Sequence, residues 1–221
     1  MLSHTVFSLP FILIAMVVAS NGLPSFYLLI LGILAAFFAR TFAMSVNRFA
    51  DRKFDAKNPR TASRPSVDGR VSGKAQLFVI FGCAASFIVV SYAINELAFA
   101  LSFAILPILA AYSYFKRFSS AAHLVLGLSL ALAPIAGEIA VSEAVSAWSI
   151  LLALGVLFWV AGFDILYALQ DMEFDKKEGL YSIPSVFGES TSLNFAAVFH
   201  ALTIVFWFFF VKDAGLSILS M

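Results

Sequence analysis

Charged residues are scarce in this chain of 221 residues, where Asp, Glu, Lys and Arg together make up only 12%. A soluble domain has about 25% charged and about 45–50% apolar residues, whereas 62% of this chain is hydrophobic. This imbalance excludes an ordinary soluble globule and predicts a polytopic protein that lies in the lipid bilayer. The formal net charge is only +1, and we expect no nucleic-acid partner.

Cysteine and histidine are also rare. Cys83 is the only cysteine, which excludes an internal disulfide and disfavours a cysteine-based metal site. The histidines, His4, His123 and His200, show no metal-ligand spacing, so we expect packing or helix-end residues. The N-terminus carries no basic stretch and no small-residue cleavage site, and no removable signal peptide is expected.

Apolar sequence is abundant, and it falls into seven stretches near the ~20 residues that a helix needs to cross a bilayer. They are 5–20, 26–46, 75–94, 97–115, 120–142, 146–170 and 191–211. Because lipid offers no hydrogen bonds to backbone groups, runs of this length are expected to be helical. The sequence therefore predicts an all-α membrane bundle of about seven transmembrane helices, as a single domain over residues 1–221.

The connections between these stretches alternate in charge. Those on one side are short and carry no Lys or Arg: 21–25, 95–96 and 142–145. Those on the other side are 44–74, 116–120 and 171–190. All of the 14 Lys and Arg residues except Lys212 lie on this second side or beside it. The positive-inside rule predicts that this side and the N-terminus are cytoplasmic.

An acidic motif follows the second apolar stretch. Asn47, Asp51 and Asp55 are spaced four apart, so they share one face if the helix continues this far, and Arg40 lies two turns earlier on nearly the same face. Two carboxylates and an amide suit a hard cation. Mg²⁺ usually takes one or two carboxylates and completes its shell with water and phosphate oxygens.

A second acidic stripe closes the sixth stretch, where Asp164, Asp171 and Asp175 are spaced seven and four apart and predict one helical face. Asp164 is expected within or just beneath the membrane surface, where a carboxylate is costly and usually functional or paired. A solvated helix end is the ordinary interpretation of one such pair. Two matched pairs on the same side instead favour a shared metal–diphosphate site, as an internal duplication of helical units would produce.

A diphosphate needs basic partners, and the candidates on the same side are Arg40, Arg48, Arg60, Arg64, Lys116 and Arg117. Such residues also set membrane topology without any further role. Tyr112 and Ser113 precede Lys116 and are candidates to bind phosphate or an aromatic substrate, although Tyr is common at membrane interfaces. Glu138 is expected to be exposed or paired near the outer end of the fifth stretch.

These motifs together resemble those of the UbiA superfamily of membrane prenyltransferases. Asn47–Asp55 is similar to its NxxxDxxxD motif and Gly162–Asp175 to its second motif. Segments 4–11, 58–65, 112–117 and 179–188 also fit, so the resemblance covers nearly the whole chain. The motif residues are most similar to those of the 4-hydroxybenzoate polyprenyltransferase-like branch. Within this branch, the pattern GFDxxYAxQDxEFD at Gly162–Asp175 favours the MqnP-type members, which act in menaquinone biosynthesis.

The resemblance implies Mg²⁺-dependent transfer of a polyprenyl group from polyprenyl diphosphate to a small aromatic acceptor. The acceptor would be of the 4-hydroxybenzoate or 1,4-dihydroxy-6-naphthoate type, in ubiquinone or menaquinone biosynthesis at a bacterial inner membrane. Asp51 and Asp55 would hold one Mg²⁺, and Asp171 and Asp175 a second, with Asn47 supporting catalysis. The substrate-binding residues implied are Arg40, Arg48, Arg60, Arg64, Tyr112, Ser113, Lys116, Arg117, Asp164 and Tyr167, of which Arg40 is the candidate for the acceptor's carboxylate.

The chain departs from this family in one respect. Family members usually have about nine transmembrane helices around a central cavity, and this sequence predicts seven, with an apolar segment opening after Asp213. A naturally short chain and a partial one both stay open, as does an inactive family member. One alternative from another class is a transporter that uses intramembrane acids. Another is a CDP-alcohol phosphotransferase, but the characteristic motif of that class, which combines Asp-Gly with Ala-Arg, is absent here.

Overall fold

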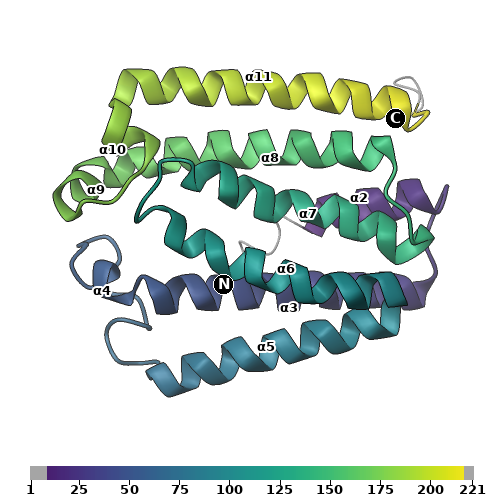
Figure 1. Ribbon diagram of the computed structural model, residues 1–221, viewed down its shortest axis with the longest axis horizontal. Helices are drawn as coiled ribbons and strands as arrows, with labels where there is room; N and C mark the ends of the chain where they lie inside the picture. Colours follow the sequence, from purple (N-terminus) through teal and green to yellow (C-terminus); the bar gives the residue numbers. More distant parts are fainter. Residues whose placement is uncertain (1–8, 217–221) are drawn as a thin grey trace.

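The structure is a computed structural model that describes residues 9–216. The described residues form helices and no strand. The helices are α2 (Leu9–Ala19), α3 (Phe26–Ala50), α4 (Arg52–Asp55), α5 (Gly73–Ile94), α6 (Glu96–Phe115), α7 (Ala122–Ser142), α8 (Ala147–Ala168), a 3₁₀ turn at Leu169–Asp171, α9 (Met172–Glu178), α10 (Ile183–Phe187) and α11 (Glu189–Asp213). The long helices run alongside one another, with α11 at one edge of the bundle and α5 at the other (Figure 1).

Six helices are long and apolar enough to cross a membrane: α3, α5, α6, α7, α8 together with the short helices that follow it, and α11. Helix α2 is apolar but shorter, with 11 residues. The predicted all-helical membrane bundle is therefore confirmed, and about seven membrane helices agree with this arrangement. The predicted first stretch began at residue 5, and its residues 5–8 lie outside the described part of the chain.

Polar caps set the starts of three membrane helices close to the predicted bounds. The side chains of Ser25, Ser72 and Asn95 each accept a hydrogen bond from the backbone N–H three residues further on, at 3.3, 3.2 and 2.7 Å. Each cap satisfies an N–H group that has no partner inside its helix. Asn95 also donates from Nδ2 to the carbonyl of Ile139 at 2.8 Å, which ties the start of α6 to α7.

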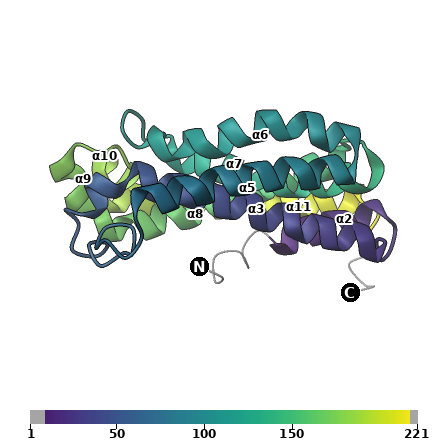
Figure 2. The ribbon, with the colours of Figure 1, turned by 90° about the horizontal axis from the view of Figure 1, so that it is seen from below.

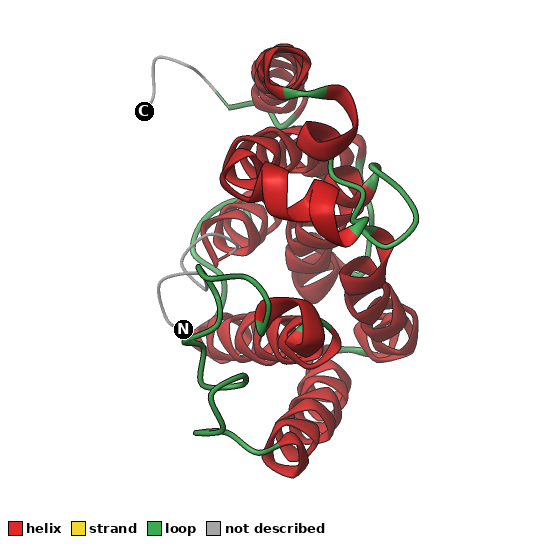
Figure 3. Cartoon of the chain, turned by 90° about the vertical axis from the view of Figure 1, so that its left-hand side faces the viewer, coloured by secondary structure: helices red, strands yellow, loops and turns green. Residues whose placement is uncertain are grey.

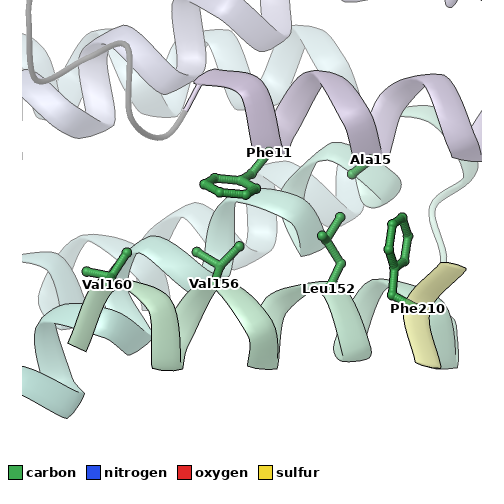
Figure 4. Close-up of a cluster of buried hydrophobic side chains, with 6 residues drawn as sticks. All are labelled: Phe11, Ala15, Leu152, Val156, Val160 and Phe210. Carbon is green, nitrogen blue, oxygen red and sulfur yellow. The ribbon is translucent and has the colours of Figure 1, made fainter. Parts of the chain in front are cut away.

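The bundle is held together by apolar contacts between helices distant in sequence. One cluster joins α2, α8 and α11 through Phe11, Ala15, Leu152, Val156, Val160 and Phe210 (Figure 4). A second cluster joins α3, α5 and α6 through Phe42, Ala43, Val46, Ile80 and Leu109. Helices α7 and α8 approach closely at Gly127, where a Cβ would lie 2.4 Å from the carbonyl oxygen of Leu157. Small residues allow such approaches between membrane helices.

Two segments of the chain gather at one end of the bundle. Helices α4, α9 and α10 and the loop after α4 lie there together, although α4 and α9 are more than a hundred residues apart (Figures 1 and 2). Figure 3 looks onto this end and shows these loops and short helices over the ends of the long helices. All the residues of the two acidic motifs belong to this end.

Glu138 lies in α7 near the opposite end, and it is buried rather than exposed, with 2% of its surface accessible. Its Oε2 accepts the backbone N–H of Ser146 at 2.9 Å. Because Ser146 caps the start of α8, this bond fixes the α7–α8 connection. The prediction that Glu138 is paired is confirmed, and its alternative, exposure, is wrong.

Replacing Glu138 by Leu is expected to destabilise the protein by about 1–3 kcal/mol, because the Ser146 N–H loses its acceptor. Glu138→Gln, whose amide oxygen can accept the same bond, is the matched control and is expected to lose less. Thermal unfolding of the purified variants in detergent measures both. Equal melting temperatures for the Leu variant and the parent would contradict the anchoring role.

Candidate active site

A cavity of about 390 Å³ opens among the residues of the motif end. It is lined by every predicted site residue except Arg117, namely Arg40, Asn47, Arg48, Asp51, Asp55, Arg60, Arg64, Tyr112, Ser113, Lys116, Asp164, Tyr167, Asp171 and Asp175. Its deeper wall is apolar and aromatic, with Leu126, Leu130, Trp159 and Phe163. A polar mouth above an apolar wall suits a ligand that has a charged head and an apolar body.

The first acidic motif keeps its four-residue repeat although its helix is interrupted. Helix α3 ends at Ala50, and Asp51 is its C-cap with φ −87° and ψ 0°. Asp55 then closes the single turn of α4. The N–H of Asp51 still donates to the carbonyl of Asn47 at 2.9 Å, and that of Asp55 to Asp51 at 2.8 Å. The three side chains therefore face the same cavity.

The second motif does not lie on one continuous helix, and that prediction is wrong. Helix α8 ends at Ala168, and a 3₁₀ turn over Leu169–Asp171 precedes α9. The 3₁₀ turn is tighter than an α-helix, so Asp171 and Asp175 are displaced from the face of Asp164. All three nevertheless line the cavity.

Two aspartates of the first motif form ion pairs with basic residues from other segments. Lys116 Nζ donates to Asp51 Oδ2 at 2.6 Å, and Arg64 Nη1 lies 2.8 Å from both oxygens of Asp55. Burial raises the pKa of the Asp51 carboxyl, and the charge of Lys116 opposes this shift. The buried Oδ1 of Asp51 has no hydrogen-bond partner among the described residues.

The loop after α4 reaches across the mouth to the second motif. Arg60 donates from Nε to Asp171 Oδ1 at 3.0 Å and from Nη2 to Oδ2, a two-pronged contact that raises the pKa of the guanidinium. Asn58 Nδ2 donates to Asp171 Oδ1 at 2.9 Å. Arg60 also donates to the Tyr167 hydroxyl at 2.7 Å and lies 5.1 Å from the centre of that ring. One loop thus connects both motifs.

Arg117 supports the first motif from outside the cavity. Its Nη2 donates to the carbonyl of Ala50 at 2.8 Å and lies 3.8 Å from Asp51 Oδ1. The guanidinium stacks on the rings of Phe54 and Tyr114 at 5.5 and 4.7 Å. Arg117 therefore holds the C-terminal end of α3, where unpaired carbonyls favour a cation.

Arg40 lies deeper in the bundle than the other basic residues of the site. It lines both the main cavity and an adjoining cavity of about 100 Å³. The smaller cavity is lined mainly by small and aliphatic side chains, among them Ala35, Ala36, Ala39, Ala43, Ala133 and Ala136. The buried Nε of Arg40 has no hydrogen-bond partner in the described part of the chain. Such an unpaired donor on a cationic side chain can bind an anionic partner.

His123 was not predicted as a site residue, yet it lines the cavity and contacts a motif residue. It lies in the first turn of α7, and its Nδ1 is 2.7 Å from Asp164 Oδ2. Asp164 was expected to be functional or paired, and His123 is the partner. The sequence contains only a weak indication of this role, namely a single histidine near the start of the apolar stretch 120–142, on the same side of the membrane as the acidic motifs.

The residues of the site fit Mg²⁺ by the chemistry of their donors. The motifs offer carboxylate and amide oxygens, which Mg²⁺ prefers, and Asp51 Oδ1 is a buried carboxylate oxygen without a hydrogen-bond donor. No group of three His, Cys, Asp or Glu side chains among residues 9–216 is arranged to hold a metal alone. This agrees with an ion that takes one or two carboxylates and fills its shell with water and phosphate oxygens.

Comparison with known proteins gives the family. The family model described as "UbiA prenyltransferase family" matches residues 8–220. This chain belongs to the UbiA prenyltransferase family. The predicted family is thereby confirmed.

Relatives and solved structures agree with this UbiA membership. 4-Hydroxybenzoate octaprenyltransferases from Tolumonas auensis and Photobacterium profundum are 33% and 32% identical, each over 92% of this chain and 76% of the relative. The apo structure of a UbiA homolog from Aeropyrum pernix K1 has a TM-score of 0.90 at 32% identity, over 98% of this chain and 82% of that one. A UbiA homolog from Archaeoglobus fulgidus bound to DMAPP and Mg²⁺ has a TM-score of 0.77 at 25% identity, over 96% and 76%.

Proposed function

We propose that this UbiA family member transfers a polyprenyl group from polyprenyl diphosphate to a small aromatic acceptor. The observation that carries the proposal is the convergence of two aspartate motifs and their basic partners on one cavity with an apolar interior. The names of the curated relatives support an aromatic acceptor. The Archaeoglobus homolog bound to a prenyl diphosphate and Mg²⁺ supports the donor and the ion.

Asp51 and Asp55 would hold one Mg²⁺, and Asp171 and Asp175 a second. When bound, Mg²⁺ neutralises the charge of the diphosphate and makes it a better leaving group. Three of these carboxylates pair with Lys116, Arg64 and Arg60 in the structure. Lysine and arginine at these positions are placed to bind diphosphate oxygens as negative charge develops there.

The apolar wall of the cavity would surround the reacting carbon. Leaving of the diphosphate gives an allylic cation, which water would trap, so Trp159 and Phe163 on the cavity wall would serve to exclude water. Arg40 would bind the carboxylate of the acceptor, since a guanidinium holds a carboxylate through two hydrogen bonds. Tyr112 and Ser113 line the cavity beside it.

The acceptor is proposed to be of the 4-hydroxybenzoate or 1,4-dihydroxy-6-naphthoate type. The relatives' names support 4-hydroxybenzoate. The residues of the second motif resemble those of MqnP-type enzymes and support the dihydroxynaphthoate. The cavity beside Arg40 is lined by several alanines, whose small side chains favour a planar aromatic ring there. We further propose that the motif end is cytoplasmic at a bacterial inner membrane, because that end carries nearly all the Lys and Arg.

The test is prenyl transfer by membranes that contain this chain. The membranes are incubated with a radiolabelled allylic diphosphate, Mg²⁺ and both acceptors, and a matched reaction contains EDTA. We expect a prenylated aromatic product that is lost with EDTA, and the acceptor used identifies the pathway. Absence of product with every acceptor, or a product that EDTA does not reduce, contradicts the proposal.

A further inference from the structure

His123 joins three helices at the deeper side of the motif end. Its ring is buried, with 3% of the residue exposed. Nδ1 lies 2.7 Å from Asp164 Oδ2 on α8, and Nε2 lies 3.1 Å from the backbone nitrogen of Ile183 at the start of α10. Both ring nitrogens are therefore occupied by partners within the protein.

The contact with Ile183 determines which nitrogen carries the proton. A backbone N–H can only donate, so Nε2 must accept and cannot be protonated. The ring proton is then on Nδ1, where it is donated to Asp164. His123 is thus held as a neutral imidazole. It has no free nitrogen with which to accept a proton from a ligand in the cavity.

Asp164 differs from the other aspartates of the cavity. Asp51, Asp55 and Asp171 pair with Lys or Arg and Asp175 interacts with Ser182, whereas Asp164 has a buried histidine as its partner. Its side chain is 30% exposed and lines the cavity, and no hydrogen bond joins Oδ1 to any of the described residues. Asp164 lies inside α8, whereas Asp171 lies in the 3₁₀ turn that follows the end of this helix at Ala168. Asp164 therefore brings to the cavity lining a carboxyl group whose Oδ1 has no hydrogen-bond donor among the described residues.

We propose that Asp164 is the base that accepts the proton from the aromatic acceptor, and that His123 is a positioning residue that orients it. This inference rests on the proposed prenyl transfer. The allylic C–O bond breaks with its electron pair leaving on the diphosphate, and a ring carbon of the acceptor bonds to the allylic carbon. The C–H electron pair then returns to the ring, restoring aromaticity, as the proton passes to Oδ1.

A carboxylate is basic enough for this step because the alkylated ring cation is a strong acid. In a cavity that excludes water, the proton needs an acceptor within the protein. The Nδ1–H of His123 fixes the orientation of the carboxylate by occupying Oδ2, which leaves Oδ1 toward the cavity. From Asp164 the proton leaves to water at the polar mouth.

The first test is Asp164→Asn, which keeps the shape of the side chain and removes the base. We expect kcat to fall at least ~100-fold, in the range of losing a general base, with little change in KM for the prenyl diphosphate. The kinetic isotope effect with an acceptor deuterated at the attacked carbon distinguishes slower proton transfer from a loss of folded protein. Proton loss is fast in the parent, so no primary isotope effect is expected there, whereas the variant is expected to show one.

The second test is a matched pair of His123 substitutions. The amide nitrogen of Asn lies where Nδ1 does, so His123→Asn keeps a donor to Asp164 and loses the acceptor for Ile183. His123→Gln reaches Ile183 and loses the donor to Asp164. A positioning role predicts that kcat falls ~10-fold or more in the Gln variant and less in the Asn variant. The reverse order would show that His123 serves only to hold the backbone at Ile183, and it would overturn the positioning role.

A third measurement is independent of activity. The chain has three histidines, so ¹⁵N-histidine NMR of the detergent-solubilised protein can resolve His123 by its loss in His123→Asn. We expect a neutral ring protonated on Nδ1 at neutral pH. A ring protonated on Nε2, or an imidazolium, would overturn the arrangement on which the inference rests.

These results distinguish a failure of the proposed prenyl transfer from a failure of the role proposed for Asp164. A parent chain that makes no prenylated product overturns the proposed function and this inference with it. An active parent whose Asp164→Asn variant is equally active and shows no isotope effect overturns the inference alone.

Discussion

Asp51→Asn and Asp171→Asn are each expected to lower turnover at least ~100-fold, the scale of losing one key electrostatic group from an active site. Asn has nearly the shape of Asp but no charge, so the change removes a proposed metal ligand and leaves the packing intact. Asp51 is 3% exposed, and Asp171 is held by Arg60 and Asn58. Both carboxylates therefore have defined positions in the lining of the cavity.

The measurement is the rate of prenyl transfer at saturating diphosphate, acceptor and Mg²⁺. Asp68→Asn is the matched control, because Asp68 lies in the loop between α4 and α5, pairs with Arg70 at 2.7 Å and does not line the cavity. Its turnover is expected to stay near that of the parent. Near-normal turnover in Asp51→Asn or Asp171→Asn would refute the assignment of the metal ligands.

Gly127→Ala is expected to destabilise the bundle by about 1–3 kcal/mol, as overpacking does in a well-packed interior. The added Cβ would lie 2.4 Å from the carbonyl oxygen of Leu157 and 3.4 Å from the Cβ of Ala161. A backbone carbonyl cannot rotate away as a side chain can, so α7 and α8 must separate. His123 lies one turn before Gly127 and bonds to Asp164 on α8, so transfer activity is expected to fall with stability.

Gly82→Ala provides the comparison. Gly82 lies inside α5, and a Cβ there would meet nothing within 4 Å, so Ala is expected to be neutral or stabilising by up to ~1 kcal/mol through helix propensity. Thermal unfolding in detergent and the transfer assay are measured for both variants. Equal melting temperatures for Gly127→Ala and Gly82→Ala would show that α7 and α8 tolerate a wider spacing than the structure indicates.

The sequence by itself determined the class of the protein, the helix positions and the acidic motifs. The reason is that lipid selects continuous apolar runs of fixed length, and that pattern is local in the chain. The capping residues Ser25, Ser72 and Asn95 lie within three residues of the predicted starts for the same reason, since a cap acts within three residues of its own position. The spacing of Asn47, Asp51 and Asp55 is likewise a local property, and it placed them on one side of the chain.

The tertiary structure decided which residues meet. Arg60 contacts Asp171 across 111 positions, and His123 contacts Asp164 across 41; no periodicity relates such positions. The break of the second motif lies at the 3₁₀ turn Leu169–Asp171, which the spacing of its aspartates did not reveal. The burial of Glu138 follows from the α7–α8 connection that it caps. These features depend on helix packing, in which each contact is set by the shapes of two distant surfaces together.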